Sequence, residues 1–219
     1  AKQQHWSVCD WLVSIFGLHR PEVWKVVLAH VSSKEMASTP CLALLNYLTT
    51  VDLVNLKSVQ RHYDCAFWSA CVNNNLAIFE FYNELGFVAY NKNDKNFRVK
   101  LFDRLAAYNG VSILGFLRQI PEFTLQDALT HFSGDMNALD MAVRSGHVDF
   151  LKALKNEWGL TAEHVRQDKN ACLRFACDHN KVHVMKFLKE QFGLTIEDAR
   201  SMRGYCLIWP ACQGHIDVV

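Results

Sequence analysis

The residue types best suited to metal chemistry lie together between positions 177 and 183. Cys177, His179 and His183 form the pattern C-x-H-x-x-x-H, and thiolates and imidazoles are ligands that zinc prefers in proteins. Asn180, however, stands where we expect a turn, so the two histidines would fall on different helices. A serine and an aspartate occupy the two histidine positions 34 residues earlier, so the pattern is not repeated. We therefore expect no metal and no cofactor here.

The eight cysteines and ten histidines also raise the question of nucleophilic catalysis by a Cys–His pair. No phosphate-binding glycine loop, zinc-protease motif or serine-hydrolase motif accompanies them. Most carboxylates fall on the expected solvent faces of helices. The cysteines form no C-x-x-C pair and are spread through apolar helical patterns, which suits buried thiols in a reducing compartment. The sequence predicts a cytoplasmic protein that is not an enzyme.

The composition is that of a globular protein and excludes several kinds of partner. Of 219 residues, 50% are hydrophobic and 21% are charged, with a net charge of +1. Lysine and arginine are scattered, so there is no basic stripe for nucleic acid. The longest apolar run, at Trp11–Leu18, is about eight residues and too short to cross a membrane. We expect no signal peptide, no small-molecule substrate, and a chain trimmed or processed before its first residue.

The elements that position these residues are repeated along the chain. Residues 153–166, ALKNEWGLTAEHVR, return 34 positions later as 187–200, FLKEQFGLTIEDAR. Identical residues stand at seven places: Leu154/Leu188, Lys155/Lys189, Gly159/Gly193, Leu160/Leu194, Thr161/Thr195, Glu163/Glu197 and Arg166/Arg200. A threonine followed by an acidic residue is typical of a helix N-cap, so this motif predicts short helices at 161–166 and 195–200. Thr124 and Asp127 predict the same cap one unit earlier.

With insertions, the pattern extends to about seven units, of which the first is degenerate and the last incomplete. The units begin near residues 10, 40, 66, 102, 137, 171 and 205. Each unit has a first helix ending in a pair of small residues, then a turn residue, then a second apolar helix. Glycine and asparagine enter the left-handed turn conformation at low cost. The predicted turn residues are Asn74, Gly110, Gly146, Asn180 and Gly214.

The pattern L-x-x-A-A-x-x-G-H-x-x-x-V/F-x-x-L resembles the ankyrin repeat. It is carried by Leu139, Ala142, Val143, Gly146, His147, Phe150, Leu151 and Leu154, and again by 214–219, GHIDVV. The likeness is to the divergent arrays of large amoebal viruses, amoebae and bacterial effectors, because GLTxEDAR-type linkers replace the usual hairpin. It implies an all-α, ankyrin-like helical-repeat solenoid of about six to seven units with a period near 34. His147 and His215 should then hydrogen-bond to the backbone at their turns.

The expected domain organisation is a degenerate repeat or helical cap at 1–38, followed by the repeat array at 39–219. Residues 91–100, NKNDKNFRVK, are predicted to be a flexible loop, either solvated or in contact with a partner. The chain ends inside an expected second helix. This predicts that the natural protein continues or that another chain covers this end.

The resemblance also implies an exposed face on the first helix of each unit. The candidate partner-binding residues are Tyr47, Tyr108, Met141, Arg144, Phe175, Asp178 and Trp209. By the same alignment Leu105 should be exposed. Aromatic residues and methionine are enriched at protein interfaces, which favours a binding groove. The alternative is that these side chains belong to the core and have no binding role.

The most direct function is that of a protein–protein interaction module, with a protein as its partner. A second possibility is a substrate-recruiting repeat region of a larger enzyme or secreted effector, whose catalytic domain lies outside this chain. A secreted effector would work in the cytosol of its host. A third is a structural spacer that binds nothing.

Overall fold

The computed structural model describes residues 64–131, 134 and 136–215. All the regular elements within these ranges are helices, which confirms the predicted all-α class. The chain divides into two compact units, Ala1–Tyr90 and Asn91–Val219. The expected N-terminal repeat or cap at 1–38 lies outside the described residues.

In the first unit, the described helices surround a cluster of aromatic rings. These helices are α5 (Asp64–Val72), α6 (Leu76–Glu84) and α7 (Phe87–Asn91), which ends just past the unit boundary. The ring of Phe67 in α5 lies 5.4 Å from Phe79, 5.8 Å from Tyr82 and 4.8 Å from Phe87, measured between centroids. All four side chains are buried, so aromatic packing joins these helices.

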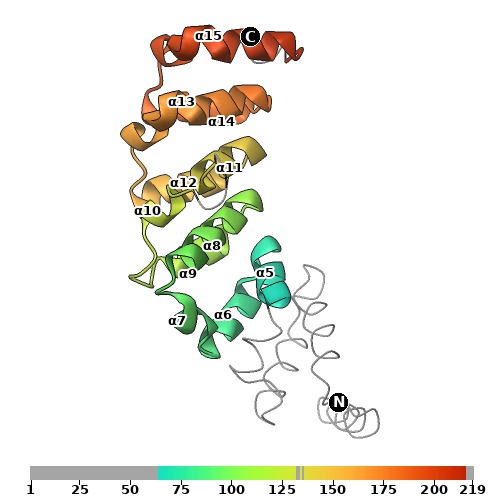
Figure 1. Cartoon of the computed structure of the whole chain (residues 1–219), viewed down its shortest axis with the longest axis vertical. Helices are drawn as coiled ribbons and strands as arrows, with labels where there is room; N and C mark the ends of the chain where they lie inside the picture. Colours follow the sequence, from blue (N-terminus) through green and yellow to red (C-terminus); the bar gives the residue numbers. More distant parts are fainter. Residues whose placement is uncertain (1–63, 132–133, 135, 216–219) are drawn as a thin grey trace, which may run out of the picture. The chain divides into compact units, whose positions relative to one another are not determined.

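The second unit is a stack of helices in two rows (Figure 1). Its helices are α8 (Lys95–Ala107), α9 (Val111–Leu117), α10 (Leu125–Ala128), α11 (Ala138–Ser145), α12 (Val148–Trp158), α13 (Ala162–Asp178), α14 (Val182–Phe192) and α15 (Ile196–Cys212). In the first row, α8 packs on α11, α11 on α13 and α13 on α15. In the second row, α9 packs on α12 and α12 on α14. The core therefore lies between consecutive layers of helices.

Each first-row helix of this unit ends in a residue with left-handed backbone geometry. The φ values are 57° at Asn109, 87° at Gly146, 52° at Asn180 and 74° at Gly214. The next amide N–H donates to the carbonyl five residues back, for example His147 to Ala142 at 2.9 Å and Lys181 to Ala176 at 2.8 Å. This bond caps a helix end that would otherwise leave carbonyl groups unpaired. Asn74, with a φ of 50°, ends α5 of the first unit in the same way.

The turn predicted at Gly110 is off by one residue. Asn109 takes the left-handed conformation, whereas Gly110 has a φ of −74° and precedes α9. A side chain at Gly110 would place its Cβ 2.5 Å from Cδ2 and 3.1 Å from Cα of Leu105, so the buried leucine would have to move to admit it. The prediction failed because Asn and Gly, adjacent in the sequence, both suit a turn. As a result, every residue of α8 aligns one position differently from the prediction.

The predicted loop at 91–100 is mostly helix. The helix α8 begins at Lys95, and the side chain of Asp94 accepts a hydrogen bond of 2.9 Å from the backbone N–H of Asn96. Lys95 is exposed and Arg98 is paired with Asp127, while Phe97 and Val99 are buried. A run of polar residues was therefore mistaken for a loop.

The threonine caps predicted from the repeated motif are present. Thr124, Thr161 and Thr195 precede α10, α13 and α15, each in a capping box with the residue three positions later. That residue is His164 after Thr161 and Asp198 after Thr195, so the repeated glutamates of the motif are not the capping partners. The first part of α13 ends as predicted, because the backbone from Gln167 to Asn170 leaves the helical conformation.

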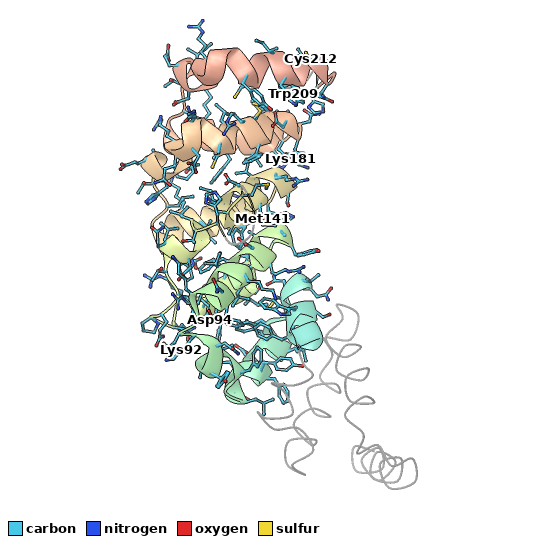
Figure 2. The ribbon with its side chains drawn as sticks, in the orientation of Figure 1. Lys92, Asp94, Met141, Lys181, Trp209 and Cys212 are labelled. Carbon is cyan, nitrogen blue, oxygen red and sulfur yellow. The ribbon has the colours of Figure 1, made fainter. Side chains whose placement is uncertain are left out.

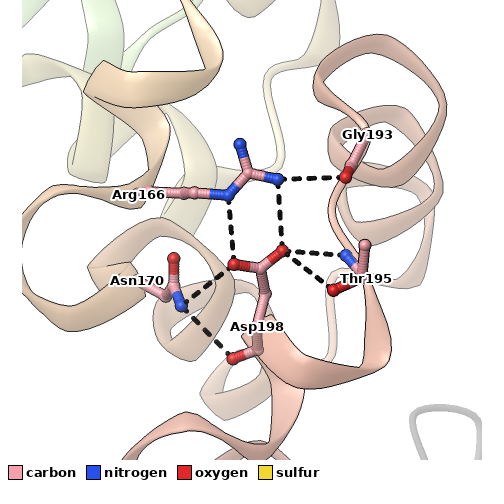
Figure 3. A network of polar contacts seen from close by, with 5 residues as sticks. All are labelled: Arg166, Asn170, Gly193, Thr195 and Asp198. Carbon is pink, nitrogen blue, oxygen red and sulfur yellow. Dashed lines mark hydrogen bonds and ion pairs between the residues drawn. The ribbon is translucent and has the colours of Figure 1, made fainter.

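An ion pair joins the linker at the start of α13 to the next linker (Figure 3). Nε and Nη2 of Arg166 donate to the two carboxylate oxygens of Asp198 at 3.1 and 3.2 Å. Nη2 also donates to the carbonyl of Gly193 at 3.0 Å, and the amide of Thr195 donates to Asp198 at 2.8 Å. The bond from Arg166 holds the pKa of Asp198 below its ordinary value. The Asp198 carboxylate therefore has two roles: it binds Arg166 of the preceding linker, and it caps the N-terminus of α15 through Thr195.

We predict that Arg166→Ala lowers the free energy of unfolding by about 1 kcal/mol, or about 2–4 °C in Tm, because the pair is partly solvated. Arg166→Lys should recover only part of this loss, since an ammonium group does not make the bidentate contact. The pKa of Asp198 is lowered in the folded state, so its contribution should be present at neutral pH and disappear as the carboxylate is protonated in acid.

Thermal unfolding by circular dichroism, at pH 7 and about pH 3, measures this effect. The matched control is Arg200→Ala, which removes the exposed arginine that stands 34 residues later in the repeat. Equal losses in the two alanine variants, or a loss from Arg166→Ala that persists in acid, would show that the ion pair does not stabilise the stack.

Candidate functional site

The turn residues give a common numbering for the first-row helices and so for the predicted binding residues. Met141, Phe175 and Trp209 each stand five residues before a left-handed turn, at Gly146, Asn180 and Gly214. They therefore occupy equivalent positions on α11, α13 and α15, as the alignment expected. In α8 the equivalent residue is Arg104, which the alignment missed.

Leu105, which the alignment placed on the exposed face, is completely buried. It aligns with Ala142 of α11, whose side chain is also buried, because the turn after α8 is at Asn109. Tyr108, the C-cap residue of α8, aligns with Ser145 and not with Arg144. The expectation for Leu105 was therefore wrong, although Tyr108 does reach the surface.

None of the six described candidates is a buried core residue. Tyr108 is 47% exposed and Trp209 44% exposed, and Arg144 is exposed as well. The other three candidates, Met141, Phe175 and Asp178, are partly buried. Tyr47 lies outside the described residues. Apolar and aromatic surface thus remains in contact with solvent on successive first-row helices.

A pair of stacked rings lies on α15 at this face. Tyr205 and Trp209 have their centroids 6.0 Å apart and their planes 8° apart. The hydroxyl of Tyr205 donates to Oδ2 of Asp178 on α13 at 3.2 Å, and the guanidinium of Arg174 lies 6.0 Å from the Tyr205 ring. The pair is thereby fixed to the neighbouring helix. Tyr205 was not among the predicted residues, although its spacing from Trp209 places both on one side of a helix.

The groups around the stacked pair are electrostatically perturbed. Burial raises the pKa of Asp178, and the hydrogen bond from Tyr205 offsets part of that shift. Burial also raises the pKa of Tyr205, helped by the nearby carboxylate. The pKa of His179 is lowered by burial and by the positive charge of Arg144. The end of α13 therefore holds a carboxylate that is costly to ionise beside a histidine that is costly to protonate.

The Cys–His segment does not come together as a zinc site. Nε2 of His183 donates to the carbonyl of Gly146 at 2.9 Å, and His179 caps the end of α13, so they serve different elements. The pKa of Cys177 lies well above its ordinary value. The main cause is a hydrogen bond with the Cys206 thiol, and burial adds to it. Among the described residues, no group of three or more His, Cys, Asp or Glu side chains could hold a metal ion.

The two turn histidines bond to backbone carbonyls as expected, but these carbonyls belong to the preceding layer and not to the histidines' own turns. Nδ1 of His147 donates to the carbonyl of Ala106 at 2.9 Å, and Nδ1 of His215 donates to the carbonyl of Cys177 at 3.4 Å. Each ring therefore ties a turn to the end of the preceding first-row helix.

Asp103 of α8 is a partly buried carboxylate on the same row of helices. Its Oδ1 atom is enclosed and has no hydrogen-bond partner among the described residues. Burial raises the pKa of Asp103 to about 6, and the nearby positive charge of His131 offsets part of this effect. Ionisation of Asp103 at neutral pH therefore destabilises the folded state.

The chain matches no protein-family model, no curated protein and no solved structure. Among the described residues, no helix is long and apolar enough to span a membrane.

We predict that Asp103→Asn stabilises the protein at pH 7.5 and has little effect near pH 4. The folded state raises the pKa from 3.8 to about 6, so wild-type stability should fall as pH rises between these values and then level off. Because the group is partly solvated, we expect a gain of about 1 kcal/mol at pH 7.5.

Urea unfolding curves at the two pH values measure the difference. Asp149→Asn is the matched control, since Asp149 is an exposed carboxylate on α12. A gain of equal size at both pH values would indicate improved packing in place of relief from a buried charge. No gain at pH 7.5 would mean that the Asp103 carboxylate is well solvated.

Proposed function

We propose that this chain is a protein-interaction module that binds a protein partner along its first row of helices. In this proposal the fold is an ankyrin-like solenoid of about six to seven units, with a degenerate repeat or cap at 1–38 and the array at 39–219. The protein needs no cofactor, catalyses no reaction itself and works in the cytosol. The proposal extends the observed two-row stacking to the whole chain.

The observation that carries the proposal is the recurrence of large, solvent-accessible side chains at one position of successive helices. Met141, Phe175 and Trp209 stand at equivalent places, and the last of these is stacked on Tyr205. Tyr205 is held by a hydrogen bond to Asp178, so the Trp209 ring stacked on it loses little freedom when a partner covers it. Pre-ordered aromatic side chains with exposed surface are typical of interface hot spots.

Two of the buried thiols also support binding over catalysis. Burial raises the pKa of the Cys172 thiol well above its ordinary value, and the pKa of Cys177 is raised as well. Protonated, enclosed thiols are poor nucleophiles. The hydrogen bonds of His147, His183 and His215 engage backbone carbonyl groups. These groups serve the fold.

A photo-crosslinking amino acid placed on each row tests the proposal. We expect benzoylphenylalanine at position 175 or 209 to crosslink a discrete protein from a cell lysate, and the unlabelled chain to compete with it. The same residue at Lys186 or Glu190, both exposed on α14 of the second row, is the matched control and should give no such product. Trp209→Ala should abolish the crosslink from position 175.

Trp209 is 44% exposed, so its replacement by alanine should leave the helical circular dichroism spectrum and the Tm nearly unchanged. Saturable crosslinks from the second row alone would place the binding surface elsewhere. The absence of any competed product from either row would contradict the interaction-module proposal.

A further inference from the structure

Arginine, lysine and histidine side chains lie close together at the turns that follow α11, α13 and α15. We call this the turn edge; its residues are Arg144, His147, His179, Lys181, His183 and His215. Side chains from one turn lie over the turn before it. A Cβ built on Gly146 would lie 3.0 Å from Nε2 of His183 and 3.2 Å from Cδ of Lys181. The turn edge is thus one continuous surface of neighbouring side chains.

The histidines of the turn edge are held in place. Each of His147, His183 and His215 donates one ring nitrogen to a backbone carbonyl of the preceding layer. The other nitrogen of each neutral ring carries no proton and accepts hydrogen bonds; it donates to a ligand oxygen only when the imidazole is protonated. Rings fixed in this way need little reordering when a ligand arrives.

The fixed charges of the turn edge are positive. Arg144 and Lys181 both act on His179 as neighbouring cations, and His215 lies within the same group. Asp178 is the carboxylate among them, and it is partly buried and hydrogen-bonded to Tyr205. The nearby Asp149 is paired with Lys152 at 3.0 Å. A ligand approaching this edge therefore meets the exposed Arg144, the partly buried Lys181 and a set of histidines.

The turn edge is continuous with the aromatic part of the first row. Trp209 stacks on Tyr205, Tyr205 donates to Asp178, and Asp178 is followed directly by His179. Figure 2 shows Met141, Lys181, Trp209 and Cys212 following one another along the same side of the ribbon. One ligand segment could therefore reach an apolar ring and a positive group together.

We propose that the partner of this face is an acidic peptide segment, with Asp or Glu carboxylates against Arg144 and Lys181 and an aromatic or large aliphatic residue against Trp209. This inference rests on the proposed interaction function and adds the chemistry of its partner. Charge complementarity selects the partner and speeds association, while the exposed ring supplies buried area. Once protonated, the histidines of the turn edge add donors for the carboxylates through their second ring nitrogens.

An acidic protein segment is favoured over nucleic acid for this surface. Nucleic-acid binding typically engages about six to ten phosphates through lysine and arginine. The turn edge has two such cations, and Asp178 lies among them. A short run of carboxylates matches this charge better than a phosphate backbone does.

A random 12-residue peptide display library, selected on the full chain, tests the partner chemistry without assuming it. We expect enriched peptides to be acidic, to contain an aromatic or large aliphatic residue, and to lose binding with Trp209→Ala. Measured by fluorescence anisotropy, affinity should fall about tenfold with Arg144→Glu/Lys181→Glu and less with Arg144→Gln/Lys181→Gln. It should also weaken between about 50 and 300 mM NaCl.

The matched control is Lys186→Glu/Lys189→Glu, which makes the same charge change at two exposed positions of α14 and should alter affinity by less than about twofold. Neutral or basic peptides that still depend on Trp209 would overturn the acidic partner and leave the interaction module standing. Displacement of an acidic peptide by a single-stranded oligonucleotide would also overturn it, in favour of nucleic acid. If no peptide is enriched, the acidic-peptide proposal fails, and the crosslinking experiment alone decides the interaction module.

Discussion

The left-handed turn that ends each first-row helix is the constraint on which the stack depends. At Asn109, Gly146, Asn180 and Gly214 the chain reverses within three residues, and the next amide closes a bond to the carbonyl five positions back. That bond pairs a carbonyl that the helix end would leave unsatisfied and fixes where the second-row helix begins. Residues four and three positions before the first three of these turns are therefore all buried.

The linkers provide the second constraint, because they set the distance from one turn to the next. A threonine cap starts each linker helix, and in two of the linkers an arginine pairs with the aspartate of the capping box. Arg98 contacts Asp127 and Arg166 contacts Asp198, both at 3.1 Å. These bonds are polar and directional, so they fix the angle between layers in a way that apolar packing alone does not.

The sequence predicted the features that follow from backbone chemistry. Glycine and asparagine marked four of the five described turns, and threonine with a following polar residue marked the linker helices, because few residue types suit those conformations. The prediction failed at Asn109 and Gly110, where two permissive residues are adjacent and only the contact with Leu105 distinguishes them. It failed again at 91–100, because polar residues occur both in loops and on the solvent side of a helix such as α8. Tyr205 was missed because its hydrogen bond to Asp178 joins two helices, although its spacing from Trp209 marked it as a neighbour of that ring.

The same constraints explain why the candidate face can differ from layer to layer. The turn, the two buried residues before it and the capping box are fixed by backbone geometry, whereas the residue five positions before the turn is not. That place holds Arg104, Met141, Phe175 and Trp209 in successive layers without any change in the turn bonds. The neighbouring place, two before the turn, holds Ala107, Arg144, Asp178 and Cys212. The fold accepts arginine, methionine, phenylalanine and tryptophan at this position, so binding to a ligand can determine which residue stands there. Because these side chains are not constrained by the turns or caps, the first row is the place to seek the protein's function.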